Sequence, residues 1–488
     1  MTRREFIVAT SVLPAAASLA AESPPPQAKA AASPTPKPKP AAPKSGPPQI
    51  APLAPIPGPP CLEAGPMLGH VSDSEAWIWV KVSKPANLKL RVSEHADLTG
   101  AKETTVGNVG EGTGRTAAVR VDALQPGTRF YYEVLLDDRV VSASPAASFI
   151  TAPPSGANGR LRVAFGSCVG RLPEHSAAAW GDIASRANFD LFLMLGDNHY
   201  ADSTDLERQR LYYTAHRQLA GFREITAQRP MYAIWDDHDF GPNNSDSTSA
   251  GKEQSRQAFF EYWANPVRTA EPQDPAIYHT FERSGVGFFM LDVRWHRTPN
   301  KEPDGAAKTM LGATQLAWLK RELKASKARV KILASGSEWQ TFSQPDSWAK
   351  FLTERDALLA WMQQEGIEGV IFLSGDRHFS AGYHIHDKWV EFTAGPLGST
   401  NEKSAKAVVS PETFTIHHDG KMWMVLDIDS SAPNATPTVT YEVWQAGEGM
   451  IDSQLVAWDA ICGRALIAKS DRVMEVREEQ EKLKAGRS

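Results

Sequence analysis

Residues 191–200 read Leu-Phe-Leu-Met-Leu-Gly-Asp-Asn-His-Tyr, five apolar residues followed directly by a glycine and a polar cluster. A short apolar run of this kind is typical of a strand that is buried on both faces of a sheet. Ligands of open α/β sheets gather at the carboxyl ends of the strands. Asp197 and the residues after it therefore occupy the place where such a sheet would carry functional side chains.

The same arrangement recurs along the chain between residues 158 and 465. Amphipathic stretches separate the apolar runs, and buried strands that alternate with helices indicate an α/β layer architecture. Polar clusters follow the strands predicted at 161–165, 191–195, 231–235, 288–291 and 370–373. Further strands are predicted at 330–334, 389–393, 422–428 and 439–444, and helices at 175–187, 206–218, 254–263, 312–324 and 348–363.

The clusters at these strand ends contain carboxylates, imidazoles, a thiol and a phenol. So much negative charge in one place is unfavourable unless cations compensate it. Two metal ions that share a carboxylate, about 3.5–4 Å apart, would do so and would stabilise both oxygens of a displacement at phosphorus. Oxygen ligands favour hard ions, whereas thiolate and phenolate together favour Fe(III). Each cluster alone is typical of a turn, a buried thiol or an ion pair, and only their joint occurrence predicts a metal site.

These motifs resemble those of the alkaline phosphatase D (PhoD-like) family in the calcineurin-like metallophosphoesterase superfamily. The resemblance spans roughly residues 62–400 and keeps the motif order. It implies a four-layer αββα domain preceded by a small all-β, fibronectin type III-like domain. It also implies an Fe(III) and Ca²⁺ centre, with one iron and one or more calcium ions, that cleaves phosphate mono- or diesters. The motifs are Gly166-Ser167-Cys168, Gly196 to Tyr200, Trp235 to Asp239, Leu291 to Arg294 and Ser374 to His378.

The resemblance implies a role for each matched metal ligand. Asp197 would bridge the two ions, Tyr200 would bind iron as a phenolate, and Asp237 would bind the second ion. Asp replaces the first histidine of the superfamily's late His-x-His pair, which suits Ca²⁺ better than Zn²⁺. The complete set of implied metal ligands is Cys168, Asp197, Tyr200, Asp237, Asp376 and His378.

Two positions stay open in this comparison. The shell of the second ion is incomplete, and either Glu338 or Gln340 would add an oxygen. His199 lies where the family commonly has an aliphatic or aromatic residue, and we expect it not to bind metal. The implied catalytic residues are His238, which would contact the phosphate and protonate the leaving oxygen, with Arg294 or Arg377 assisting.

The first 60 residues predict export rather than a folded domain. Residues 1–21 have the charged start, short apolar middle and small-residue end of a secretory signal peptide, and Arg3-Arg4 resembles a twin-arginine signal. The alternative, a membrane anchor, is disfavoured because Pro14 interrupts an apolar run shorter than the roughly 20 residues of a span. Residues 22–60, rich in Pro, Ala and Lys, predict a disordered linker.

The rest of the chain is predicted to hold a PhoD-like N-terminal β-sandwich domain at 61–152, a metallophosphatase domain at 158–465 and a charged helical tail at 466–488. Period-two alternation at 76–82, 88–92 and 130–134 predicts the sandwich strands. Residues 1–60 carry a net charge of +4, which leaves −9 for the remainder of a chain whose total is −5. This charge excludes a general nucleic-acid or anionic-lipid binder. A Cys61–Cys462 disulfide stays open.

The sequence thus predicts an exported, metal-dependent phosphatase or phosphodiesterase, periplasmic or secreted, that uses a metal-activated hydroxide. Its expected partners are a small phosphate mono- or diester and the twin-arginine export machinery, with no nucleic-acid surface and no transmembrane span. The alternatives are a phospholipase D-like diesterase with the same metals and a non-catalytic secreted binding protein on a Pro-rich stalk.

Overall fold

A computed structural model of the chain describes residues 49–142, 147–268, 271–342, 346–386, 388–401, 409–471, 473–475 and 478. The predicted signal peptide and most of the predicted linker lie outside these residues, as does most of the predicted tail. Everything described below belongs to one compact unit, residues 48–488. In the described part of the chain, no helix has the length and apolar character needed to cross a membrane.

The region after the linker is all-β and consists of two antiparallel sheets around one apolar core. Its likeness to a fibronectin type III domain stays a prediction. The first sheet has the order β1-β2-β5, from β1 (Leu62–Val71), β2 (Ala76–Val82) and β5 (Thr116–Val121), with a 3₁₀ turn, η1 (Glu111–Thr113), just before β5. The second sheet contains β3 (Ala86–Ser93), β4 (Lys102–Val109), β6 (Arg129–Leu136), β7 (Arg139–Val140) and β8 (Ala147–Ile150).

A six-stranded mixed sheet follows, in the order β11-β10-β9-β19-β20-β21. Its parallel half consists of β9 (Arg160–Gly166), β10 (Leu191–Leu195) and β11 (Met231–Ile234). Its antiparallel half consists of β19 (Met422–Asp429), β20 (Thr438–Gln445) and β21 (Gly449–Val456). The segments between its strands carry α1 (Glu174–Arg186), α2 (Leu206–Arg217), α3 (Ala220–Thr226), α4 (Asp237–Phe240) and α5 (Lys252–Tyr262).

The other large sheet has seven strands in the order β12-β13-β14-β15-β17-β16-β18. Its strands are β12 (His279–Arg283), β13 (Val286–Met290), β14 (Val330–Ser335), β15 (Val370–Ser374), β16 (Ser380–Ile385), β17 (Trp389–Thr393) and β18 (Thr413–His417). The run from β13 through β14 and β15 to β17 is parallel. Its helices are α6 (Gly312–Ala325), η2 (Trp348–Lys350) and α7 (Leu352–Gln364), and α8 (Trp458–Ile461) follows β21.

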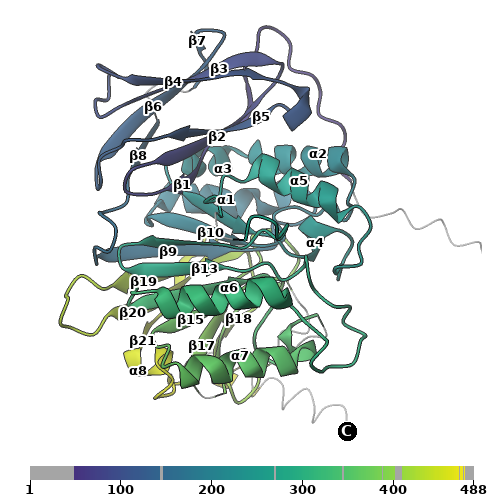
Figure 1. Ribbon diagram of the computed structural model, residues 1–488, viewed down its shortest axis with the longest axis vertical. Coiled ribbons are helices and arrows are strands. Elements are labelled where there is room, and N and C mark those ends of the chain that lie inside the picture. The colour runs from purple at the N-terminus through teal and green to yellow at the C-terminus, as the bar shows by residue number, and fades with distance from the viewer. Residues whose placement is uncertain are drawn as a thin grey trace, which may run out of the picture. The chain divides into compact units, whose positions relative to one another are not determined.

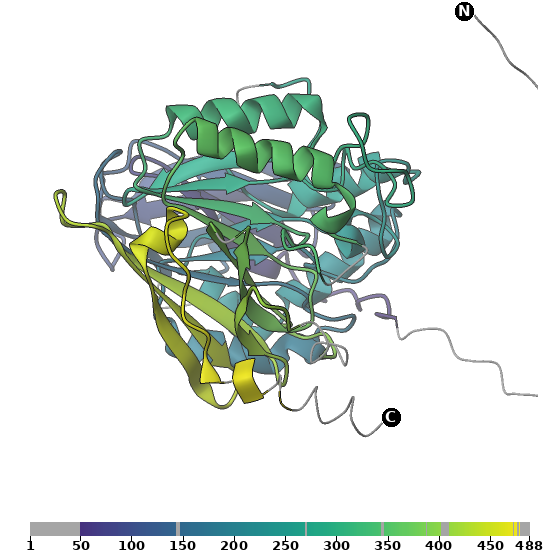
Figure 2. The same ribbon diagram turned by 90° about the horizontal axis from the view of Figure 1, so that it is seen from below.

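The two large sheets bury their apolar side chains in one shared core, which contains Phe165 and Leu193 of one sheet and Leu333 and Phe372 of the other. Figures 1 and 2 show α6 and α7 side by side along the seven-stranded sheet. The predicted α/β layering is therefore present, with a mixed α/β fold built on two sheets. This arrangement brings the carboxyl ends of parallel strands from both sheets to the same side of the core.

The open disulfide is not formed. Cys61, Cys168 and Cys462 are all free thiols. Cys61 precedes β1 and its Sγ lies 3.4 Å from the hydroxyl of Ser83, whereas Cys462 follows α8. The structure therefore answers the question that the sequence left open, with no bridge between these two residues.

Candidate metal centre

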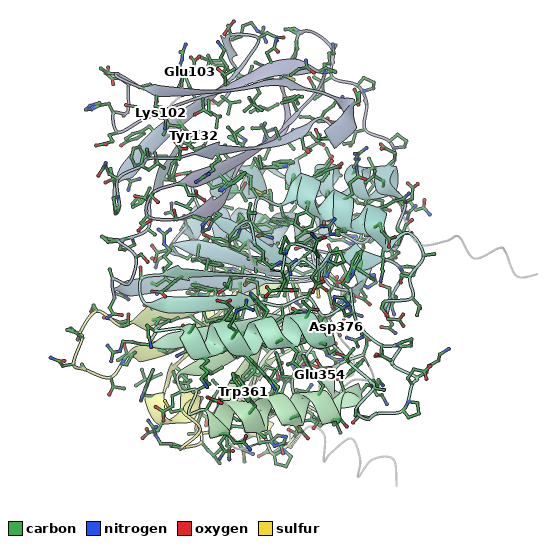
Figure 3. All side chains as sticks on the ribbon, viewed as in Figure 1. Lys102, Glu103, Tyr132, Glu354, Trp361 and Asp376 are labelled. Carbon is green, nitrogen blue, oxygen red and sulfur yellow. The ribbon has the colours of Figure 1, made fainter. Side chains whose placement is uncertain are left out.

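The site is built from segments that leave the carboxyl ends of parallel strands. Cys168 follows β9, Asp197 follows β10 and Asp237 follows β11 in the six-stranded sheet. Asp376, labelled in Figure 3, follows β15 in the seven-stranded sheet. Because the parallel strands of a sheet end at one edge, each sheet collects its polar side chains there, and the shared core brings the two edges together.

The first group of candidate ligands joins a thiol, a carboxylate and an imidazole. Atoms of Cys168, Asp197 and His378 lie within 4.8 Å of one another. Tyr200 belongs to the same group, because its hydroxyl donates to Asp197 Oδ2 over 2.8 Å and lies 3.3 Å from His378 Nε2. The hydroxyl of Ser399 in turn donates to the Tyr200 oxygen over 2.8 Å. Four sequence-predicted ligands thus converge at one point.

Two further groups continue from the first. One combines Asp197 with Asp237 and His238, and the other combines Asp236 with Asp237 and Asp376. In each group the ligand atoms lie within 4.8 Å of one another. Asp197 belongs to the first two groups and Asp237 to the last two, so the candidate ligands form a continuous row in which Asp197 stands between two positions.

The hydrogen bonding of the row fits bound cations. Asp197 Oδ1 and Asp236 Oδ2 are buried, and neither has a hydrogen-bond partner among the described residues. A buried carboxylate oxygen without a partner is costly, and a cation would remove that cost. The donors also differ along the row. One end offers a thiol, a phenol, an imidazole and a carboxylate, and the other end, with Asp236, Asp237 and Asp376, offers oxygens alone.

Burial dominates the electrostatics of the row. It raises the pKa of Asp197 well above the usual range, and the nearby carboxylates of Asp237 and Asp236 raise it further. Burial likewise raises the pKa of Cys168 and of Asp376, each next to other negative groups. Burial alone would raise the pKa of Asp237 as well, but His238 and Arg294 hold it below its usual value. The row therefore has an excess of negative charge that a bound cation would neutralise.

His238 is oriented by a residue that the sequence reasoning missed. Asp202 Oδ1 lies 2.5 Å from His238 Nδ1, and the other oxygen of Asp202 pairs with Arg171 over 2.5 Å. Burial alone would lower the pKa of His238, but Asp237, Asp197 and Asp202 raise it to about 10. The imidazole is therefore held through Nδ1, and one of its ring nitrogens lies within 4.8 Å of ligand atoms of Asp197 and Asp237.

The two candidate catalytic arginines differ in their surroundings. Arg294 is 0% exposed, and its guanidinium donates to Asp236 over 2.7 Å, to Asp346 over 2.9 Å and to the carbonyl of Ser245 over 3.1 Å. It therefore holds Asp236 in place and has no face toward solvent. Arg377 is 2% exposed and lies 3.5 Å from a carboxylate oxygen of Glu338.

The structure also places the residues that the sequence left open. Glu338 is buried, accepts a hydrogen bond from Gln340 over 2.6 Å and belongs to none of the three ligand groups. His199 lies outside these groups too. It is buried, and its Nδ1 accepts a hydrogen bond from the backbone N–H of Ala201 over 3.2 Å.

Sequence reasoning missed Asp236 as a candidate ligand because its neighbour Asp237 matched the motif. It missed Asp202, Asp346 and Ser399 because contacts between distant segments leave no local pattern. The sequence also did not predict the backbone conformation of three candidate ligands. Cys168, Asp197 and Asp376 have φ values of 59°, 53° and 64°, in the left-handed region. Non-glycine residues in this conformation cost about 1–3 kcal/mol each and cluster at functional sites.

Comparison with known proteins supports the same reading of the chain. The model of the PhoD-like phosphatase family matches residues 163–460, and a model described as a domain of unknown function (DUF7800) matches residues 60–155. Alkaline phosphatase D of Bacillus subtilis (strain 168) is 26% identical over 320 residues, 55% of this chain and 54% of that protein. The chain thus aligns with about half the length of this curated relative.

Solved structures show a similar fold. The structure of PhoD has 18% identity and a TM-score of 0.65, covering 87% of this chain and 98% of that one. Purple acid phosphatase PPD1 from yellow lupin (Lupinus luteus) seeds has 13% identity and a TM-score of 0.61, covering 83% of this chain and 77% of that one. At these identities the likeness concerns the fold.

Proposed function

Because the chain belongs to the PhoD-like phosphatase family, whose model matches more than half of its length, we propose that it is a metal-dependent phosphatase or phosphodiesterase. The observation that carries the proposal is the position of Asp197. This buried carboxylate lies in two adjacent groups of candidate ligands and keeps one oxygen without a hydrogen-bond partner among the described residues. A carboxylate shared in this way suits a bridge between two cations.

The donor types support a mixed-metal centre. Cys168, Tyr200, Asp197 and His378 would hold Fe(III), since a thiolate and a phenolate favour that ion. Asp236, Asp237 and Asp376 would hold Ca²⁺, which prefers oxygen ligands. Bound together, the ions would activate a water molecule and neutralise charge on the phosphate oxygens.

The protein's own groups would then position the substrate and move the proton. Asp202 holds Nδ1 of His238, which leaves Nε2 to contact a phosphate oxygen and to protonate the leaving group. Arg377 supplies positive charge beside Asp376. Arg294 is a positioning residue in this account, because each nitrogen of its buried guanidinium already donates to the protein.

We further propose that the protein is exported to the periplasm or secreted. The signal-peptide pattern at 1–21, its twin-arginine pair and the Pro-rich segment at 22–60 support this proposal. A twin-arginine route carries folded proteins and would allow the metals to enter before export. Fusion of residues 1–60 to a reporter that is active only outside the cytoplasm tests it. Export that stops when Arg3-Arg4 is changed to Lys-Lys is expected, and unchanged export would contradict the twin-arginine route.

Elemental analysis of the natively purified protein, combined with chromogenic monoester and diester assays at alkaline pH, tests the enzymatic proposal. We expect bound iron and calcium, turnover that chelation abolishes, and a visible charge-transfer band. Cys168→Ser should lower iron retention and weaken the band, whereas Cys462→Ser, at a thiol that belongs to none of the ligand groups, should change neither. Full turnover in protein without metal would overturn the proposal.

A further inference from the structure

The β1-β2-β5 sheet of the N-terminal domain has two buried faces, and β2 divides its side chains between them. Ile78 and Val80 belong to the core of the N-terminal domain. Trp79, which points to the opposite face, is 1% exposed and belongs to the core of the two large sheets. Its indole N–H donates to the carbonyl of Glu261, at the end of α5, over 2.7 Å. The N-terminal domain therefore inserts an aromatic side chain into the domain that carries the metal ligands.

Trp79 is one of five aromatic residues that surround a buried arginine. The guanidinium carbon of Arg217, at the end of α2, lies within 5.8 Å of five ring centroids. One of its nitrogens donates to the carbonyl of Tyr262 over 2.9 Å. Ring faces stabilise a desolvated cation. We call this set, Arg217 with Trp79, Tyr213, Phe222, Tyr262 and Trp263, the Arg217 box.

The Arg217 box touches the loop that carries two candidate metal ligands. Tyr213 stacks on Tyr262 with ring centroids 4.9 Å apart, and its ring meets the His199 ring edge to face at 4.1 Å. His199 lies between Asp197 and Tyr200, and its Nδ1 accepts the N–H of Ala201. A continuous set of packed rings thus leads from β2 of the N-terminal domain to the segment 197–201.

We propose that the N-terminal domain is a positioning domain for the metal centre and that His199 is the residue through which it acts. Asp197 has a φ of 53°, a conformation that persists only where the surroundings impose it. His199, two residues after Asp197, packs against Tyr213, and this contact restrains the backbone at Asp197. Trp79 of the N-terminal domain holds the Arg217 box in place through its contact with Arg217. The expected effect on turnover rests on the proposed function, whereas the expected rigidity of the segment 197–201 does not.

Two tryptophans on one face of β2 provide a matched pair of variants. Trp77 lies two residues before Trp79, is partly buried against the same core, and its N–H donates to Glu75.

Hydrogen exchange is measured on metal-free protein over the peptide 197–205, where the N–H of Asn198 donates to Asp239 and that of Ala201 to His199. Trp79→Leu should speed exchange at these amides at least tenfold, and Trp77→Leu should leave it near the parent rate.

A second pair of variants tests the loop residue itself, and it carries the test if Trp79→Leu does not fold. His199→Ala removes the ring that contacts Tyr213, and His199→Phe restores a ring in its place. His199→Ala should speed exchange and, in metal-loaded protein, shift the charge-transfer band and lower kcat by about 10–100-fold with little change in KM, the usual cost of disturbing groups around metal ligands. His199→Phe should recover most of the protection of the Asn198 amide, whose acceptor is Asp239, but not that of Ala201, because phenylalanine lacks the Nδ1 acceptor.

The outcomes separate this inference from the proposed function. If the parent protein binds no metal and shows no turnover, the proposed function fails, and the exchange data still decide whether the N-terminal domain orders the loop. If the parent is active but Trp79→Leu and His199→Ala exchange and turn over like Trp77→Leu, the N-terminal domain does not position the site and the inference is wrong.

Discussion

Asp197 is the residue on which the site depends most, since it contributes to two of the three ligand groups. Asp197→Asn keeps the shape of the side chain but removes its charge and weakens its affinity for a bridged pair of cations. We expect bound metal and turnover to fall together below one hundredth of the parent values, about 2.7 kcal/mol or more. Metal analysis and the diester assay measure this. Asp138→Asn, at an exposed position of the N-terminal domain, is the control. Full activity with metals retained would contradict the bridging role.

Asp202 gives a second prediction at this scale. Its carboxylate fixes the orientation of His238 through Nδ1 over 2.5 Å. Asp202→Asn should therefore lower kcat by about 10–100-fold while metal content stays near the parent value, because the change affects proton delivery rather than the ligands. Arg171→Gln removes the other partner of Asp202 and a 3.3 Å bond to the backbone carbonyl of Tyr200, leaves the bond between Asp202 and His238 in place, and should have the smaller effect. An unchanged kcat, or loss of metal in Asp202→Asn, would contradict the assignment.

The sequence could predict residues that belong to a local pattern. Cys168, Asp197 and Asp237 each follow an apolar strand, so their place in the chain indicated their place in the fold. It could not predict which partners they meet. The bonds from Arg294 to Asp346 and from Ser399 to Tyr200 join segments more than 50 residues apart, and only the folded chain brings them together.

At the scale of the element, strands buried on both faces were the most predictable feature. The run 191–195 matches β10 and 389–393 matches β17 without shift, since continuous apolar residues leave little choice of boundary. The predicted helix at 348–363 is instead divided into η2 and α7. Phe351, between them, has a φ of −133° and is fully buried, so tertiary packing outweighs helix propensity there.

β12 supplies a prediction on pH. Burial lowers the pKa of His279 from 6.5 to about 4 in the folded protein. The unfolded chain takes up this proton first as the pH falls from 6.5 to 4, so stability decreases through that window by up to about 3 kcal/mol. His279→Gln should make the unfolding free energy less dependent on pH there, whereas His95→Gln, at an exposed position, should not. Equal pH dependence in the parent and His279→Gln, by denaturant unfolding, would contradict it.

At the scale of the molecule, the two large sheets bring the ends of their parallel strands together, and the sequence predicted this convergence only in part. Alternating strands and helices predicted α/β layers. No local sequence pattern indicated that β9 to β11 belong to one sheet and β13 to β15 to another. The N-terminal domain was recognisable as all-β from its alternation. Its contact with the ligand-bearing domain was not, because Trp79 looks like any other strand residue until its face is known.

Metal binding should stabilise the whole molecule, since the row of carboxylates repels itself without cations. Chelation should lower the melting temperature by several degrees, and metal at a hundredfold its Kd should restore about 2.7 kcal/mol of stability. Calorimetry before and after dialysis against a chelator measures the change. In Asp197→Asn, chelation should have little effect. A melting temperature that chelation leaves unchanged in the parent would contradict this.

The most direct test of the central claim is a crystal structure of the natively purified protein with anomalous data collected at the iron absorption edge. We expect a strong anomalous peak among Cys168 Sγ, the Asp197 carboxylate, the Tyr200 oxygen and His378, and a second cation beside Asp237 and Asp376. Crystals of active protein that show no peak there, with Asp197, Asp237 and Asp376 turned to separate surroundings, would contradict it.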